Sequence, residues 1–135
     1  MIKSQDNPAS LIESDTDISS LVSRAGRNLE KNLVDIRKVK QSQTRNINLQ
    51  ARDLIDLIQK FLSELLYLEE TYQLVFSQVD VQINERNVSL SGQLKGERLD
   101  KSRHQQKNPP KSPERKDISL KKDGKSWQLE VKLSL

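Results

Sequence analysis

The sequence has few of the residue types from which active sites are built. It contains no cysteine and one histidine, His104, which lies in a charged stretch that also holds prolines. Without a second histidine or any thiol, metal sites rich in nitrogen and sulfur ligands and cysteine nucleophiles are excluded. A Ser/His/Asp centre would have to use His104, in a segment that we predict to be disordered.

The remaining chemical patterns also favour a protein without catalysis. Glu69 and Glu70 are adjacent on a predicted helix, so they do not share one face and are best interpreted as solvated. Gly92 and Gly96 stand alone, without the flanking residues of a phosphate-binding loop. We therefore expect no enzyme, no cofactor and no metal ion.

Composition indicates one domain with polar appendages. The 135 residues are 33% hydrophobic and 31% charged, so only part of the chain can form a core. The N-terminus lacks the apolar run of a signal peptide, and charged residues interrupt the apolar region 54–79, which excludes a membrane span. We expect a soluble protein of the cytoplasm, or of the nucleus in a eukaryotic cell.

Residues 1–14 are predicted to form a flexible tail, and residues 15–78 a helical, coiled-coil region. Asp15, Thr16 or Asp17 can cap the first helix. The second helix carries the strongest pattern, with apolar or aromatic residues at alternating spacings of four and three: Ile47, Ala51, Leu54, Ile58, Phe61, Leu65, Leu68, Tyr72, Val75 and Val79. Such a heptad repeat is typical of a helix that packs along another helix.

The polar residues 40–46 separate the two helical patterns, and the heptad phase slips there by one residue. Two structures fit, either a helical hairpin or one helix of about 60 residues. A loop absorbs the slip more easily, which favours the hairpin, but no glycine or proline forces a turn.

Beyond about residue 78 the apolar period becomes two, which predicts antiparallel strands over 79–135. A first hairpin would place Ile83 opposite Val88. A second, turning at Asp123-Gly124, would place Leu120 opposite Trp127. The predicted fold class is α+β, with an N-terminal helical hairpin or long coiled-coil helix followed by an antiparallel sheet of about four strands.

A long basic loop, residues 95–116, interrupts this predicted sheet. Three of the protein's four prolines lie in it, and we expect it to be disordered. Pro110 to Arg115 also fits a PxxP ligand, and Ser112-Pro113 fits a proline-directed phosphorylation site. Both patterns also arise by chance in basic loops that contain proline, so the sequence leaves their use open.

The predicted helix is about 50 Å long, more than a four-stranded sheet can cover. We therefore predict a non-enzymatic assembly subunit whose heptad helix 47–79 docks on a partner chain or on a second copy. The predicted contact residues are Ile47, Leu54, Ile55, Ile58, Phe61, Leu62 and Leu65.

The alternative function is binding of nucleic acid, or of another acidic surface, without sequence specificity. Residues 95–125 contain eleven Lys or Arg against five Asp or Glu. Such a segment can neutralise phosphates. The residues that would do so are Lys101, Arg103, Lys107, Lys111, Arg115, Lys116, Lys121 and Lys122.

Overall fold

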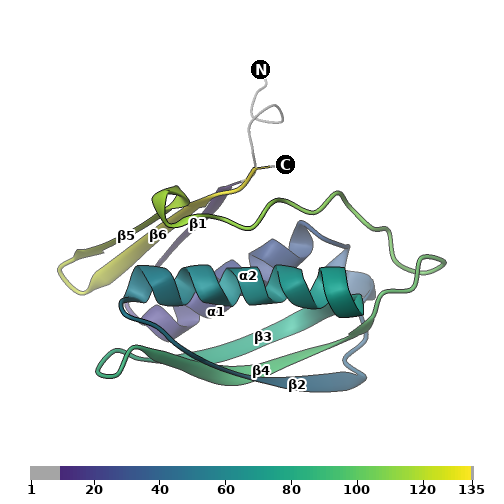
Figure 1. Cartoon of the computed structure of the whole chain (residues 1–135), viewed down its shortest axis with the longest axis horizontal. Coiled ribbons are helices and arrows are strands. Elements are labelled where there is room, and N and C mark those ends of the chain that lie inside the picture. Colours follow the sequence, from purple (N-terminus) through teal and green to yellow (C-terminus); the bar gives the residue numbers. More distant parts are fainter. Residues whose placement is uncertain (1–9, 135) are drawn as a thin grey trace.

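The computed structural model describes residues 10–134, which form two α-helices held between two antiparallel three-stranded sheets (Figure 1). The elements in chain order are β1 (Ser10–Asp15), α1 (Ile18–Lys31), β2 (Gln43–Gln50), α2 (Leu54–Tyr72), β3 (Leu74–Asn84), β4 (Ser89–Arg98), β5 (Ile118–Asp123) and β6 (Ser126–Lys132). Short 3-10 turns, η2 (Ile36–Lys38) and η3 (Arg115–Asp117), follow α1 and precede β5.

The sheets join distant parts of the chain. One has the order β1-β6-β5, so it pairs the first described strand with the last. The other has the order β2-β4-β3. The two helices lie in the layer between the sheets, so their apolar faces are covered from both sides (Figure 1).

The helices are positioned by caps and by one close contact. The Asp17 carboxylate accepts the Ser19 amide at the start of α1, in agreement with the predicted capping region, and Asp53 caps α2 in the same way. Gly26 lets α1 approach α2, because a Cβ there would lie 2.7 Å from Cζ of Phe61. The Phe61 ring is fully buried at this crossing.

Strands β3 and β4 also approach each other closely. A Cβ on Gly96 would lie 1.9 Å from the Val75 carbonyl oxygen, so only glycine fits there. A register shift between Phe76 and Gln78 adds a bulge to β3 at the same level. The bulge and the glycine increase the local twist of the sheet over the helices.

Side chains of α1 cover the outer edge of β3. The Ser19 hydroxyl oxygen accepts the Ile83 amide at 2.8 Å, and one Glu30 oxygen accepts the Phe76 amide at 2.9 Å. Between these two, Ser23 bonds both backbone groups of Val81. Backbone groups of β3 that could otherwise pair with another strand thereby form their hydrogen bonds within the chain.

The predicted helical hairpin or coiled coil is wrong. Residues 43–50, which the sequence assigned to the inter-helix link and the second helix, form β2, and the second helix ends at Tyr72. Ile47 and Leu49 alternate with polar residues, which is a strand period, and the heptad match at Ile47 is a coincidence of spacing.

The predictions for both ends of the chain also need correction. Residues 10–14 of the predicted tail belong to β1, while residues 1–9 lie outside the described part. The single four-stranded sheet is wrong, since the two predicted hairpins belong to different sheets. The predicted disordered loop 95–116 begins inside β4, which runs to Arg98.

Both hairpins exist, but each register differs from the prediction by two residues. Ile83 faces Leu90 instead of Val88, because the turn is longer. Leu120 faces Leu129 instead of Trp127, because Asp123 pairs with Ser126 and the turn is centred on Gly124-Lys125. A shift of two residues keeps every side chain on its predicted face.

Candidate functional site

An extended segment crosses the outside of α2 and forms the most distinctive surface of the molecule. Residues 106–115, here called the strap, run antiparallel to the helix (Figure 1). Gln106 donates to the Glu69 carboxylate near one end of α2, and Gln59 donates to the Pro113 carbonyl near the other. These contacts hold the strap along most of the helix.

The end of the strap is fixed by an ion-pair cluster. One nitrogen of Arg115 lies 2.9 Å from an Asp53 oxygen and 2.5 Å from an Asp56 oxygen. Hydrogen bonds from the Arg115 guanidinium lower the pKa of Asp53 to about 2 and also lower that of Asp56. Arg115 therefore ties the strap to the N-terminal cap of α2.

Between these attachments the strap and α2 enclose a groove of about 580 Å³. Its lining combines apolar, aromatic, hydroxyl and charged side chains: Ser63, Leu66, Tyr67, Glu69 and Glu70 from α2, and Pro109, Pro110, Lys111 and Ser112 from the strap. Both walls thus come from the segments just described. The hydroxyl oxygens of Ser63 and Ser112 lie 2.5 Å apart and connect the walls.

The two carboxylates of the groove differ in environment. Glu69 is buried, and burial raises its pKa, opposed by the hydrogen bond from Gln106. Glu70 is exposed. With Lys111 as the one cation in the lining, the groove can present negative charge beside apolar surface.

Two exposed tyrosines lie at or near the groove. Tyr67 and Tyr72 keep 49% and 47% of their surface exposed and, with Ile12 on β1, are the exposed large hydrophobic residues of the described chain. Their rings meet edge to face with centroids 5.9 Å apart. The Arg45 guanidinium of β2 lies 5.3 Å from the centroid of the Tyr72 ring, which is the distance of a cation–π contact.

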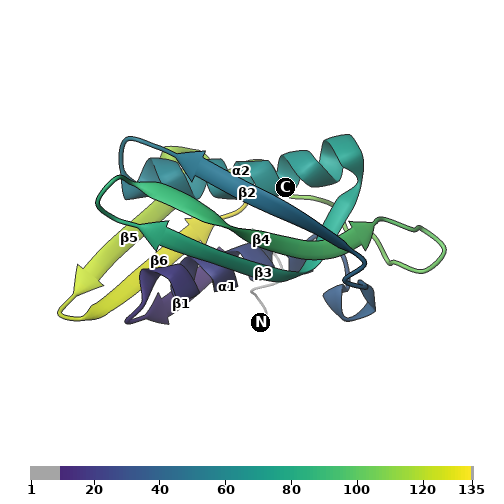
Figure 2. The ribbon, with the colours of Figure 1, turned by 90° about the horizontal axis from the view of Figure 1, so that it is seen from below.

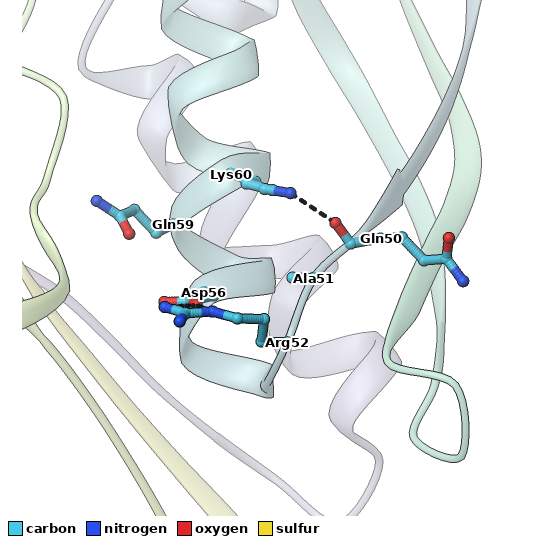
Figure 3. Close-up of a pocket in the computed structure, with 6 residues that line it drawn as sticks. All are labelled: Gln50, Ala51, Arg52, Asp56, Gln59 and Lys60. Atoms are coloured by element: carbon cyan, nitrogen blue, oxygen red, sulfur yellow. Dashed lines mark hydrogen bonds and ion pairs between the residues drawn. The ribbon is translucent and has the colours of Figure 1, made fainter.

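A second hollow of about 580 Å³ lies where β2 passes into α2 (Figure 3). The Lys60 ammonium donates to the Gln50 carbonyl at 2.7 Å, and the Arg52 guanidinium pairs with Asp56 at 3.0 Å. Because these charged groups are already matched within the chain, the hollow is the weaker candidate site.

His104 is buried and has a structural role. Its Nδ1 atom accepts the Asp100 amide at 2.8 Å, so the proton lies on Nε2, which is 3.0 Å from the Glu97 carboxylate. Arg103 also binds Glu97 through two nitrogens, and this guanidinium lowers the pKa of Glu97 to about 2. Both ring nitrogens of His104 are occupied, which leaves neither free for acid–base catalysis.

The predicted docking surface is wrong, because most of it lies in the protein's own core. Ile47, Ile58, Phe61, Leu62 and Leu65 are buried, and Leu54 and Ile55 are partly buried against the same cluster. The apolar cover that the sequence assigned to a partner comes from α1 and from a second sheet that the sequence did not predict.

The basic residues of the alternative prediction do not form one surface. Arg103 and Arg115 are held in ion pairs, and the Lys107 ammonium donates to the Lys31 carbonyl. Lys121 and Lys122 lie on the β5–β6 hairpin, where Lys122 lies over the Trp127 ring. Nucleic-acid binding stays a prediction.

Sequence reasoning missed the groove, although one signal was present. Leu66 and Tyr67 are large and fall outside the heptad positions, so they could have marked a second functional face of α2. Pro109 was interpreted only as a residue that interrupts strand pairing, and Pro110 also as the start of a PxxP pattern. Within residues 10–134, no cluster of acidic, histidine or cysteine side chains could hold a metal ion, and neither helix has the length and apolar character that crossing a bilayer requires.

Two sheets enclosing two helices, with a strap along one of them, define the class of small α+β protein to which this chain belongs. A solution structure of Methanobacterium thermoautotrophicum protein 1598 matches this chain with a TM-score of 0.76 at 19% identity. The match covers 96% of this chain and 93% of that protein. The crystal structure of an archease from Thermotoga maritima, described as a possible chaperone, matches all of this chain with a TM-score of 0.67 at 12% identity, and covers 98% of that chain.

Sequence comparison assigns the family. The model of the Archease protein family matches residues 14–133. Protein archease of Thermococcus gammatolerans is 35% identical over 102 residues, which cover 73% of this chain and 71% of that protein. Protein archease of Pyrococcus abyssi is 30% identical over 103 residues, covering 73% and 72%. The chain therefore belongs to the archease family.

Proposed function

We propose that this chain is a non-catalytic accessory protein that binds a segment of another protein in the groove between α2 and the strap. The observation that carries the proposal is the combination of exposed Tyr67 with two prolines and two carboxylates in one groove. The Thermotoga maritima relative is described as a possible chaperone, and action on a partner protein agrees with that description.

The groove uses a different face of α2 from the heptad stripe. Leu66, Tyr67 and Glu70 are absent from that stripe, and Tyr67 and Glu70 are exposed. Aromatic and proline side chains provide a rigid apolar surface at low entropic cost. The adjacent carboxylates favour a cation, so the matching partner segment is apolar and carries Lys or Arg.

The proposal of a non-catalytic role rests on the chemistry of the site. The groove presents hydroxyl and carboxylate groups without a histidine, and the protein's sole histidine is bonded through both ring nitrogens. A serine hydroxyl needs an adjacent base to become a nucleophile. The neighbour of Ser63 is the hydroxyl of Ser112, which is not one.

A peptide titration followed by NMR tests this proposal. The probe is a 13-residue peptide of alternating leucine and arginine, and the matched control replaces each arginine by glutamate. We expect amide shifts at Leu66, Tyr67 and Glu70 with the basic peptide only. Equal binding of both peptides, or shifts confined to other residues, would contradict the proposal.

Two substitutions with the same charge change make the test specific. Glu70→Lys should weaken binding of the basic peptide at least tenfold, because it removes an attraction and adds a repulsion. Glu85→Lys makes the same change in the turn between β3 and β4 and should leave the affinity unchanged. Equal losses for both variants would indicate a general charge effect and count against the groove.

A further inference from the structure

The outer edge of β2 is open, in contrast to that of β3. β2 pairs with β4 only, and it forms the front edge of its sheet in Figure 1 and the upper edge in Figure 2. Its eight residues contain neither proline nor glycine, and its register with β4 is continuous. Strands of this kind are templates for pairing with another strand.

The register identifies the backbone groups that point outwards. The Ala51 amide donates to the Val88 carbonyl at 3.1 Å, so Ala51 faces β4. In a regular antiparallel pair, the backbone N–H and C=O groups of successive residues point alternately towards the partner strand and away from it. The backbone groups of Thr44, Asn46 and Asn48 therefore point away from β4. Within residues 10–134, no hydrogen bond reaches the backbone of these three.

The same alternation describes β3 correctly, which supports its use for β2. It turns Phe76, Val81 and Ile83 away from β4, and these are residues whose amides bond to Glu30, Ser23 and Ser19 of α1. The corresponding edge of β2 receives one side chain, Lys60, on the Gln50 carbonyl at its end.

The side chains along this edge offer little protection against pairing. Thr44, Asn46 and Asn48 are exposed and uncharged. The one charged residue of β2, Arg45, lies over the Tyr72 ring. By comparison, the edge strands β1 and β5 carry two acidic residues and two lysines respectively.

We propose that β2 pairs with β2 of a second copy of this chain, antiparallel and about a two-fold axis at Ile47. Outward-facing residues must meet outward-facing residues, so Asn46 of one copy lies opposite Asn48 of the other, and Thr44 opposite Gln50. Ile47 then meets Ile47 of the second copy on the helix side. The two sheets become one sheet of six strands.

The charges of β2 agree with this register. Arg45 lies opposite Leu49 of the second copy, and the two arginines are about 13 Å apart at roughly 3.3 Å per residue. No charged side chain of β2 faces a like charge across the axis. The amide side chains of Asn46 and Asn48 can each donate and accept, so they suit a mutual pair.

The test is the oligomeric state of the full chain, measured by analytical ultracentrifugation over a concentration series. We expect a reversible dimer, together with slower hydrogen exchange of the Asn46 and Asn48 amides as concentration rises. Asn46→Lys/Asn48→Lys sets lysine against lysine at both positions and should raise the dissociation constant at least tenfold. Asn46→Lys/Asn48→Glu sets lysine against glutamate and should restore the dimer.

Gln82→Lys/Asn84→Lys is the matched control, since both residues are exposed on β3, which β4 separates from β2 in the same sheet. It should leave the dimer intact. A monomeric wild type, or a dimer that survives Asn46→Lys/Asn48→Lys, would overturn the proposal. The inference does not depend on the groove, because Glu70→Lys should leave the dimer unchanged.

Discussion

The Ser23 hydroxyl bonds both backbone groups of Val81, accepting its amide at 3.0 Å and donating to its carbonyl at 3.2 Å. One helix side chain thereby takes the place of a neighbouring strand at the edge of β3. Ser19 and Glu30 act in the same way one turn before and two turns after it. The edge of β3 is therefore closed by α1.

Removal of the Ser23 hydroxyl should lower the free energy of unfolding more than the loss of one exposed hydroxyl does. Ser23→Ala leaves a partly buried amide and carbonyl unpaired, which costs about 1–3 kcal/mol of unfolding free energy. Ser20→Ala, on the exposed side of α1, is the control and should cost less than about 1 kcal/mol. Urea denaturation measures both, and equal effects would contradict the edge-covering role.

Glu30 should make the protein less stable as the pH rises. Burial raises its pKa to about 8 from an ordinary value of 4.5, opposed by the Phe76 amide. As the pH rises, Glu30 loses its proton in the unfolded chain at a lower pH than in the folded protein. The free energy of unfolding therefore falls between pH 4.5 and pH 8, by on the order of 3 kcal/mol from pH 5 to pH 8.

Glu30→Gln keeps an oxygen for the Phe76 amide but cannot titrate, so most of this decline should disappear. Glu69, whose pKa is also raised by burial, contributes in the same direction and can be separated by Glu69→Gln. Unfolding free energies measured at several pH values provide the comparison. A wild type and a Glu30→Gln variant with parallel pH profiles would show that Glu30 ionises normally.

Glu97 should make the protein less stable as the pH falls into the acid range. Hydrogen bonds from Arg103, and then from the Lys40 amide and His104, lower its pKa to about 2 against opposing burial. The stability that it contributes is present above pH 4.5 and is lost as the pH falls towards 2. Glu97→Gln should flatten the acid limb of a stability profile measured between pH 2 and pH 5, and an unchanged limb would contradict this assignment.

Two glycines should respond differently to alanine. Gly96→Ala places a Cβ against the Val75 carbonyl and should cost more than about 3 kcal/mol or prevent folding. Gly124→Ala meets open space, and only its left-handed backbone, with φ +62°, opposes it, so the cost is about 1–2 kcal/mol. Thermal unfolding distinguishes the two, and a reversed order would contradict the close approach of β3 and β4.

Arg115→Gln should loosen the strap without unfolding the domain. Exposed ion pairs contribute about 1 kcal/mol or less, so global stability should change little. Hydrogen exchange should nevertheless accelerate in residues 106–115 and at the first turn of α2. Arg52→Gln, which removes a different partner of Asp56, is the control and should leave exchange in the strap unchanged.

Local patterns in the sequence determined the start of the first helix, the presence of the two hairpins and the sides of the strands that face the core. Asp17 caps the first helix because a short acidic side chain satisfies free amides wherever it occurs. Leu120 and Leu129 share one face because side chains alternate along a strand, and a shift of two residues in register preserves that face. These features depend on neighbours a few residues apart.

Only the tertiary structure decided what covers these elements. The residues from Ile47 to Leu65 needed apolar cover, and the sequence could not show that α1 and a sheet closed by β1 and β6 supply it. That pairing joins residues more than 100 positions apart and leaves no local pattern. The groove and the open edge of β2 exist for the same reason, because each depends on where distant segments come to lie.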